Sequence, residues 1–319
     1  MRILVIKLAA LGDVVLAFAA MRRIREAHPE AQITLLTTPP FEGLARASGL
    51  FDAVETDGRP RRLGALLAML RRLRRARYDL VYDLQTSSRS SGYFYALWPR
   101  PPRWSGIAAG CALPHANPDR DRMHTLERQA DQLKAAGIWP DAPTAPGTAP
   151  PPDLGFMLKT DDPQRSPGRF GLTSPYALLI PGASPHRPDK RWPVTHYAEL
   201  AAALAREGLA VAMIGGHAEA GLAEEMAGQA PDLVNLTGQT DFAQVASLAA
   251  HADLVVGNDT GPTHLAAAAG APTLVLFSQA SDPALCAPRG RRVDVLRESR
   301  LEDLEVNTVL QAARDVRTA

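Results

Sequence analysis

The stretch Asp253–Gly270, DLVVGNDTGPTHLAAAAG, joins a short apolar run to an alanine-rich segment through a polar loop. Asp253–Val256 has the near-continuous apolar character of a strand that is covered on both faces of its sheet. Pro262 fits the first turn of a helix, where its missing N–H costs nothing, so we expect a helix over Pro262–Ala269. A buried strand followed by a helix is the repeating unit of α/β proteins.

The same alternation extends through most of the chain. We predict strands at Arg2–Ile6, Gln32–Thr37, Asp79–Asp83, Tyr176–Ile180, Leu209–Ile214, Asp253–Val256 and Thr273–Phe277. We predict helices at Val14–Ala27, Leu63–Ala76, Ser88–Trp98, Thr195–Arg206, Ala218–Gln229, Phe242–His251 and Pro262–Ala269. This order predicts doubly wound parallel sheets with crossover helices, in which ligands bind beyond the carboxyl ends of the strands.

Length and composition fit two globular domains. The chain has 319 residues, of which 46% are hydrophobic and 22% charged, and domains typically hold about 100–200 residues. The proline-rich segment Trp139–Asp153 cannot form regular structure. We therefore predict an N-terminal domain over 1–165 and a C-terminal domain over 166–319, and leave open whether the last helix returns to the first domain.

The net charge of +1 conceals an asymmetry between the two halves. Residues 1–150 hold 21 basic and 14 acidic side chains, a balance of +7, whereas residues 151–319 hold 14 and 20, a balance of −6. A basic first half favours an anionic ligand there. Since only four of the 35 basic residues are lysines, a lysine in a loop after a strand is a candidate for a specific role.

Several classes of protein are disfavoured. Cys111 and Cys286 are too few and too far apart for a disulfide framework or a zinc site, as expected in a reducing cytoplasm. The first residues resemble a signal peptide, but Lys7 and Asp13 interrupt what would be its apolar core. The alanine-rich stretch around Gly270 is broken by glycine and proline, unlike a membrane span. We expect a cytoplasmic protein without a metal.

The loop Lys7–Asp13, KLAALGD, follows the first predicted strand. It lacks the GxGxxG fingerprint of dinucleotide-binding dehydrogenases. Gly12 permits a tight turn, and Asp13 stands at the start of a helix. Asp13 is either a helix N-cap or a carboxylate that acts as a general base, and the loop alone favours the cap.

The loop Pro181–Pro193, PGASPHRPDKRWP, follows another buried strand. Gly182 and Ser184 offer backbone and hydroxyl donors, and Lys190 brings a compact positive charge. Such a loop suits a phosphate group, although a basic loop is often only a solvated surface.

The loop Gly257–His264, GNDTGPTH, is the most specific of these motifs. At Thr260 and Gly261 the backbone N–H groups of a helix N-terminus point at an anion. Asp259 is suited to accept hydrogen bonds from sugar hydroxyls, and His264 lies one helical turn from Thr260.

A glycine pair and an acid follow a further predicted strand in Gly215–Glu219, GGHAE. This signal is weak alone. It is compatible with a carboxylate at Glu219 that accepts hydrogen bonds from a ribose.

Together KLAALGD, PGAS with DKRWP, GGHAE and GNDTGPTH, in this order, resemble glycosyltransferase family 9, the lipopolysaccharide heptosyltransferases that transfer a heptose from an ADP-sugar. The resemblance covers the chain from residue 1 to about residue 290. It implies an α/β GT-B fold, with two Rossmann-like doubly wound domains facing each other across a cleft. The acceptor side comes first and the donor side second. It also implies an inverting, metal-independent transfer without a cofactor, ADP-heptose being the donor substrate.

The resemblance also assigns roles to residues. It implies that Asp13 is the catalytic base and that Lys190 binds phosphate and assists catalysis. Donor-binding residues are implied at Ser184, His186, Lys190, Glu219, Asp259, Thr260, Gly261 and His264. On the acceptor side we expect Lys7, Gly12, Arg59, Arg61 and Arg62, and no residue is assigned to a metal.

Eight arginines and no acidic residue lie between Arg59 and Arg77. Leucines at helical spacing in the same segment are typical of a core-facing stripe. The arginines could meet an acceptor that carries phosphates and carboxylates, or the head groups of anionic lipids. Nucleic acid is disfavoured, because no aromatic residues interleave with the basic ones.

The leading hypothesis is a monomeric sugar transferase that binds a nucleotide-sugar and an anionic glycolipid acceptor, with peripheral contact at the cytoplasmic face of the inner membrane. One alternative is a GT-B nucleotide-sugar epimerase or hydrolase, which needs no lipid acceptor. Another is a non-catalytic, membrane-associated scaffold that retains a degenerate nucleotide-sugar site.

Overall fold

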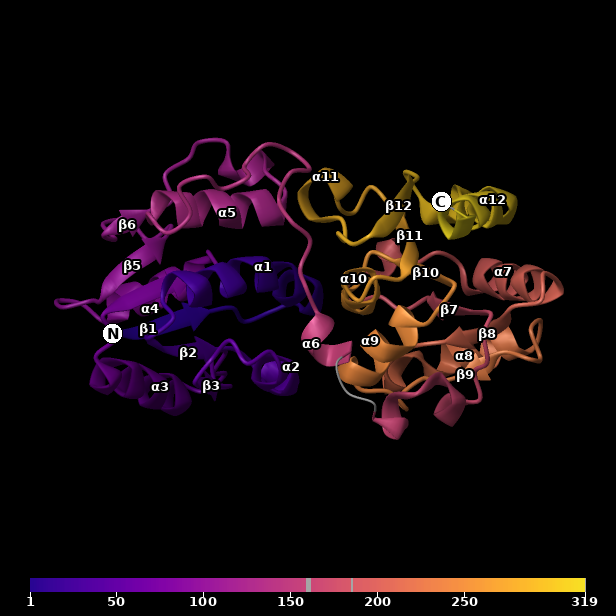
Figure 1. Cartoon of the computed structure of the whole chain (residues 1–319), viewed down its shortest axis with the longest axis horizontal. Helices are drawn as coiled ribbons and strands as arrows, with labels where there is room; N and C mark the ends of the chain where they lie inside the picture. Colours follow the sequence, from indigo (N-terminus) through magenta and orange to yellow (C-terminus); the bar gives the residue numbers. More distant parts are fainter. Residues whose placement is uncertain (159–161, 185, 319) are drawn as a thin grey trace. The chain divides into compact units, whose positions relative to one another are not determined.

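The computed structural model of the chain describes residues 1–158, 162–184 and 186–318 (Figure 1). These residues form two compact units, Met1–Pro150 and Pro151–Ala319. The sequence-based boundary lies later, between residues 165 and 166. Residues 151–158 and 162–165 belong to the second unit, because α6 (Gly155–Leu158) and the 3-10 turn Pro163–Arg165 pack against α9 (Phe242–Ala250).

The first unit contains a six-stranded parallel sheet in the order β3-β2-β1-β4-β5-β6. Its strands are β1 (Arg2–Ile6), β2 (Gln32–Leu36), β3 (Ala53–Glu55), β4 (Leu80–Asp83), β5 (Arg103–Gly106) and β6 (Leu113–Pro114). Ile3 of β1 pairs with Ile33 of β2 on one side and with Leu80 of β4 on the other. The central strands are buried on both faces, which explains their continuous apolar runs.

Helices cover this sheet in two groups. They are α1 (Leu11–Ala27), α2 (Glu42–Ala47), α3 (Leu63–Ala76), α4 (Ser88–Ala96) and α5 (Thr125–Ala135). α1 and α5 pack against each other. α3 and α4 share a separate cluster with β1 and β4, to which they contribute Met69, Leu73, Tyr93 and Phe94. α3 and α4 therefore lie on the same face of the sheet.

The second unit repeats this architecture with the strand order β12-β11-β10-β7-β8-β9. Its strands are β7 (Tyr176–Ile180), β8 (Ala210–Met213), β9 (Val234–Asn235), β10 (Leu254–Asn258), β11 (Pro272–Phe277) and β12 (Arg292–Arg297). Its remaining helices are α7 (Val194–Arg206), α8 (Ala220–Ala227), α10 (Gly261–Ala268), α11 (Pro283–Cys286) and α12 (Val306–Thr318).

The last helix packs within the second unit. Val309, Ala313 and Val316 of α12 are buried in the same cluster as residues of β10 and β11, and α12 also contacts α7 and β12. The last helix therefore belongs to the core of the second unit and does not return to the first domain, a point that the sequence left open.

In both sheets the first strand of the unit pairs with the fourth, so the chain reverses its direction of winding at that point. These switch points lie between β1 and β4 and between β7 and β10. Ligands of open α/β sheets bind beyond the carboxyl ends of the strands at such points. The loops that follow these four strands are therefore the expected place of a ligand site.

Candidate active site

The loop between β10 and α10 is drawn tightly against the sheet. The Thr263 hydroxyl donates to the Asn258 carbonyl oxygen at 2.8 Å, and the Asp259 N–H donates to the Leu276 carbonyl oxygen at 3.1 Å. A Cβ on Gly257 would lie 2.5 Å from Thr263 Oγ1, so only glycine allows this approach. Thr260 has the extended backbone of a helix N-cap and places the positive end of the α10 dipole at the carboxyl edge of the sheet.

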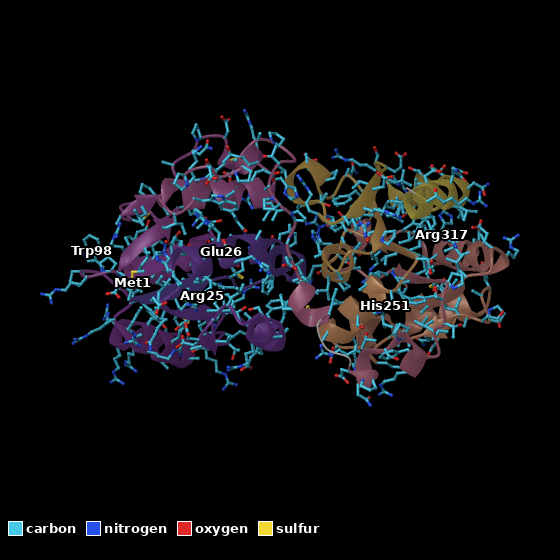
Figure 2. The ribbon with its side chains drawn as sticks, viewed as in Figure 1. Met1, Arg25, Glu26, Trp98, His251 and Arg317 are labelled. Atoms are coloured by element: carbon cyan, nitrogen blue, oxygen red, sulfur yellow. The ribbon has the colours of Figure 1, made fainter. Side chains whose placement is uncertain are left out.

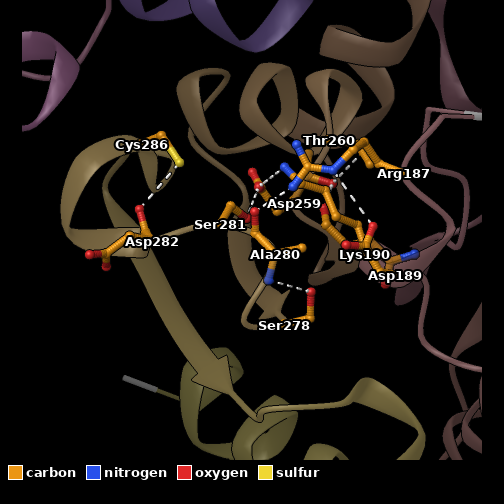
Figure 3. A network of polar contacts seen from close by, with 12 residues as sticks. Arg187, Asp189, Lys190, Asp259, Thr260, Ser278, Ala280, Ser281, Asp282 and Cys286 are labelled. Carbon is orange, nitrogen blue, oxygen red and sulfur yellow. Dashed lines mark hydrogen bonds and ion pairs between the residues drawn. The ribbon is translucent and has the colours of Figure 1, made fainter.

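Asp259 is the centre of a polar cluster (Figure 3). Its Oδ2 lies 2.5 Å from Lys190 Nζ and accepts a hydrogen bond of 2.6 Å from the Ser281 hydroxyl. Its Oδ1 lies 3.5 Å from His264 Nε2. Burial alone would raise the pKa of Asp259, but hydrogen bonds from His264, Lys190 and Ser281 together hold it well below its usual value. The carboxylate thus stays ionised and fixes the Lys190 ammonium beside the start of α10.

Asn258 anchors the loop that carries Lys190. This fully buried amide donates from Nδ2 to the Pro181 carbonyl oxygen at 2.7 Å. Its Oδ1 accepts hydrogen bonds from the Trp192 N–H at 3.2 Å and from the Tyr197 hydroxyl at 3.1 Å. The sequence analysis missed Asn258, although an amide at the end of an apolar strand was a usable signal.

Further along the same loop, the Arg187 guanidinium donates to the Ala280 carbonyl oxygen, a contact seen in Figure 3. Ser184 and His186 are both exposed on this loop. The loop thus lies over the segment that follows β11, and it exposes two of the expected donor contacts.

Glu219 packs closely against two glycines, each of which follows a strand. A Cβ on Gly182, after β7, would lie 3.0 Å from Glu219 Cγ, and one on Gly215, after β8, would lie 2.9 Å from Glu219 Cβ. The carboxylate accepts a hydrogen bond from the Gly216 N–H at 2.8 Å. Glu219 therefore belongs to the same carboxyl edge as Lys190 and Asp259.

In the first unit, Asp13 is not the N-cap of α1, which corrects the structural role considered from the sequence. The helix begins at Leu11 and Ala10 occupies the cap position. Asp13 lies in the first turn, where its Oδ2 accepts a hydrogen bond of 3.1 Å from the Ala10 N–H. Gly12 beside it is buried. Among the described residues, none donates a hydrogen bond to the second carboxylate oxygen of Asp13, which can therefore accept one from a ligand.

Asp13 lines a polar cavity of about 240 Å³ at the switch point of the first sheet. The described residues that line it are Lys7, Asp13, Leu84, Gln85, Thr86, Arg120, Asp121, Arg128, Gln129 and Gln132. The sequence analysis missed Arg120 and Arg128, because neither follows a predicted strand. The cavity combines the carboxylates of Asp13, in the first turn of α1, and Asp121 with the cationic groups of Lys7, Arg120 and Arg128.

Lys7 is only 4% exposed, and its Nζ lies 3.4 Å from the Leu84 carbonyl oxygen. Burial lowers the pKa of this lysine, and the negative charge of Asp13 opposes that effect. The neighbouring Gln85 ties the two loops together, since its Oε1 accepts a hydrogen bond of 2.8 Å from the Leu8 N–H.

Asp83, at the end of β4, supports the floor of this cavity. Its Oδ1 accepts hydrogen bonds from the Gln85 N–H at 3.1 Å and from the Thr86 N–H at 3.0 Å. These bonds help to hold Thr86 at a φ of 42°, a left-handed conformation that is unusual for this residue type. Burial raises the pKa of Asp83 to about 6.

Arg59, Arg61 and Arg62 follow β3 at the carboxyl edge of the first sheet and are exposed. None of the three lines the cavity in the described part of the chain. The structure thus places them at the same edge as Asp13, on the surface beyond β3. Within the described residues, no group of three or more His, Cys, Asp or Glu side chains is arranged to hold a metal ion.

Comparison with known proteins identifies the family. Residues 66–312 match the model of glycosyltransferase family 9 (heptosyltransferase). The chain belongs to this family. It is 31% identical to lipopolysaccharide heptosyltransferase 2 of Salmonella typhimurium, over 93% of this chain and 88% of that protein. It is also 27% identical to lipooligosaccharide heptosyltransferase 2 of Haemophilus ducreyi, with the same two coverages.

Solved structures agree with this assignment. The E. coli ADP-heptose lipopolysaccharide heptosyltransferase II structure matches with a TM-score of 0.82 and 25% identity, over 100% of this chain and 99% of that one. A family 9 protein from Veillonella parvula matches with a TM-score of 0.82 over 99% of this chain and 97% of that one, and at 20% identity it supports the fold alone. The predicted α/β GT-B fold is confirmed, and the family 9 protein described here is a glycosyltransferase.

Proposed function

We propose that this enzyme transfers a heptose from ADP-heptose to a lipopolysaccharide core acceptor, with inversion at the anomeric carbon and without a metal ion. The observation that carries the proposal is the fixed Lys190 ammonium beside the N-terminus of α10, in a chain of the heptosyltransferase family. The names of its relatives, two heptosyltransferases 2 and an ADP-heptose enzyme, support the donor and the acceptor.

The donor diphosphate binds at the switch point of the second sheet. As the sugar leaves, negative charge grows on the diphosphate, and Lys190 with the Thr260 and Gly261 amides stabilises that charge. These donors are held in place by the fold, so they need little reorganisation during the reaction. Because they supply positive charge at the phosphates, no metal is required there.

Glu219 and Asp259 complete the donor site. Glu219 accepts hydrogen bonds from the ribose hydroxyls, as acidic residues do at the edges of other nucleotide-binding sheets. Asp259 orients Lys190 and His264, and Ser184 and His186 contact the donor from the exposed side of their loop.

Asp13 acts as the general base. Its carboxylate takes the proton of the acceptor hydroxyl while that oxygen attacks the anomeric carbon from the face opposite the diphosphate. The new carbon–oxygen bond forms as the bond to the diphosphate breaks, so ADP leaves with the electron pair and the configuration inverts. General base catalysis of this kind contributes roughly 10²–10⁴-fold.

Cationic residues of the first unit bind the acceptor. Lys7, Arg120 and Arg128 line the same cavity as Asp13, and Arg59, Arg61 and Arg62 extend positive charge along the edge of the sheet. A lipopolysaccharide core precursor carries the phosphates and carboxylates that guanidinium groups recognise.

A donor screen tests this proposal. Thermal unfolding is measured with ADP-heptose, UDP-glucose and GDP-mannose, and we expect the largest stabilisation with ADP-heptose. The anomeric configuration of the product, determined by NMR in the presence of a chelator, then checks inversion and metal independence. Donor turnover without any acceptor would instead indicate an epimerase or hydrolase. A chain that none of the three nucleotide-sugars stabilises would indicate a scaffold.

A further inference from the structure

Helix α3 divides the arginine-rich segment of the first unit into two groups. Arg59, Arg61 and Arg62 precede the helix at the carboxyl edge of the sheet. The other five lie in its last turns or directly after it: Arg71, Arg72, Arg74, Arg75 and Arg77. α3 has 14 residues, so its ends are about 20 Å apart. Arg74 and Arg77 line a cavity together with Asp79, which directly precedes β4, and so lie near the amino end of that strand, whereas Arg59 follows the carboxyl end of β3.

The outer surface of α3 is unusually apolar at one end. Leu63 is 72% exposed and Leu67 is 41% exposed, whereas Met69 and Leu73 on the inner side are buried. Leu63, Leu67, Arg71 and Arg74 follow one another at intervals of four, four and three residues, so they form one exposed stripe along the helix. The sequence analysis expected a core-facing leucine stripe, and two of its leucines face outward.

An exposed tryptophan adjoins this stripe. Trp98, in the turn after α4, is 62% exposed, and Figure 2 labels it on the surface of the first unit. The Arg74 guanidinium donates to the carbonyl oxygens of Ala96 at 2.6 Å and Trp98 at 3.1 Å, and so joins the end of α3 to this turn. A surface cavity of about 860 Å³ lies between the end of α3 and the segment 97–102.

The arginines around this tryptophan outnumber the acidic residues, since Asp79 is the one carboxylate among the described residues that line the cavity. Arg71, Arg75, Arg77 and Arg100 form no ion pair with any carboxylate among the described residues. Arg72, on the other side of α3, is by contrast neutralised by acidic residues, since it pairs with Glu55 at 2.8 Å and with Asp57 at 2.5 Å. The exposed stripe thus keeps its charge available for a partner outside the chain.

We propose that this surface docks the enzyme onto an anionic phospholipid bilayer. The α3–Trp98 face, as we call it, comprises Leu63, Leu67, Arg71, Arg74, Arg75, Arg77, Trp98 and Arg100. Tryptophan and leucine side chains enter the interfacial region of the bilayer, and arginines are attracted to the negative lipid head groups. Peripheral binding that is stable needs two such signals, and this face provides both.

The charges of the chain select an anionic bilayer as the partner. Residues 1–150 carry +7, and no acidic residue interrupts the segment from Arg59 to Arg77. None of the helices in the described residues has both the length and the apolar character of a membrane span. The proposal concerns a surface outside the donor and acceptor sites and does not depend on the identity of the transferred sugar.

Vesicle sedimentation tests the electrostatic part. The probes are vesicles of phosphatidylcholine alone and vesicles with equal amounts of phosphatidylglycerol and phosphatidylcholine. The variant Arg71→Gln/Arg75→Gln/Arg100→Gln is compared with the control Arg169→Gln/Arg206→Gln/Arg291→Gln, which removes the same charge from exposed arginines of the second unit. We expect binding to the anionic vesicles only, weakened more than about tenfold in the first variant and unchanged in the control.

Tryptophan fluorescence tests insertion. Trp104 and Trp192 are buried and Trp139 is half-buried, so Trp98 should dominate any change in emission on vesicle binding. We expect a blue shift with anionic vesicles, and its loss in Trp98→Phe. Equal unfolding temperatures and equal far-ultraviolet circular dichroism spectra of all variants establish that they remain folded.

Three results would overturn the proposal. They are equal binding to both kinds of vesicle, equal loss of binding in the two triple variants, and the absence of a Trp98-dependent shift. A wild-type dimer that the first triple variant abolishes would assign the α3–Trp98 face to a second copy of the chain instead. Because vesicle binding is measured without sugar donor, failure of the proposed transfer reaction would not affect these outcomes.

Discussion

The two switch points of the molecule have the same topology and opposite arrangements of charge. In the second unit, Lys190 and Asp259 come from the loops after β7 and β10 and form an ion pair of 2.5 Å. In the first unit, Lys7 lies in the loop after β1 and Asp13 in the first turn of α1. The lysine approaches a backbone carbonyl and the carboxylate approaches a backbone amide. One unit uses a carboxylate to hold a lysine in place, and the other leaves a carboxylate available in a cationic cavity.

The largest effect is expected at the available carboxylate. Asp13→Asn keeps the shape of the side chain and removes the base, so we expect turnover to fall by roughly 10²–10⁴-fold. Donor affinity should stay within a few-fold, because the Asp13 cavity lies in the first unit. Steady-state kinetics and donor titration measure the two quantities.

Asp119→Asn is the matched control for this variant, since it removes the same charge from an exposed carboxylate of the first unit that does not line the cavity among the described residues. We expect its turnover to remain near that of the wild type. Comparable losses in both variants would reduce the role of Asp13 to a general contribution of negative charge.

A second contrast concerns pH and the stability of the two units. Burial raises the pKa of Asp83 to about 6 in the folded chain, from an ordinary value of 3.8. Between these values the folded state retains a proton that the unfolded state has lost, so stability falls as the pH rises. We expect this group to lower the free energy of unfolding by about 3 kcal/mol as the pH rises, with the full loss reached above pH 6. The substitution Asp83→Asn should abolish this pH dependence.

Asp259 should behave in the opposite way. Its folded-state pKa lies below the ordinary value of 3.8, so its contribution to stability is fully present above that value and is lost only as the pH falls below it. Urea unfolding between about pH 4 and pH 8 compares the variants. The effect of Asp83→Asn should change over this range, while that of Asp259→Asn should stay constant; parallel profiles would contradict both assignments.

The smallest effects are expected from a matched pair of lysine substitutions. Lys190→Met removes a charged donor from the proposed phosphate site, so donor affinity should fall by roughly 10–100-fold. Lys7→Met should leave donor affinity unchanged and raise the KM for the acceptor, because Lys7 lies in the Asp13 cavity. Calorimetric titration with ADP separates the two, and equal losses would show that the units do not divide the substrates as proposed.

The sequence predicted best the elements that have either a continuous apolar run or a clear helical period. β1, β7 and α3 have the predicted bounds, because continuous apolar runs and a clear helical period mark them. The edge strand β12, RVDVLR, was missed because it alternates with charged residues and is only partly buried. Strands of two residues, such as β6 and β9, are too short to leave a pattern.

Helix α5 was missed for a different reason. It buries Glu127, Gln129 and Gln132, so its inner face carries polar residues where a periodic pattern needs apolar ones. Gln132 has partners in three dimensions that no local pattern shows, since its Nε2 donates to the carbonyl oxygen of Asp83 at 3.0 Å.

The residues of the candidate site likewise fall into those that the sequence pattern could predict and those that it could not. Residues in loops directly after apolar strands, such as Lys190 and Glu219, could be selected from the sequence because topology brings those loops to one edge. Asn258 and Arg120 could not, because their positions depend on which side chains meet after folding. Asp13 was considered as a helix cap because of its place in the sequence. The helix α1 begins two residues earlier, at Leu11, so Asp13 lies within its first turn.

Asn258 also makes the loop between β7 and α7, which carries Lys190, a structurally separate segment. A single amide binds both ends of the segment, the Pro181 carbonyl oxygen and the Trp192 N–H, so the loop is closed at its base. We expect that residues 183–189 can be exchanged as a block without disturbing β7 or β10, provided that Gly182 and Lys190 are kept for their contacts with Glu219 and Asp259. This segment is therefore the natural place to graft a different donor specificity onto the same scaffold.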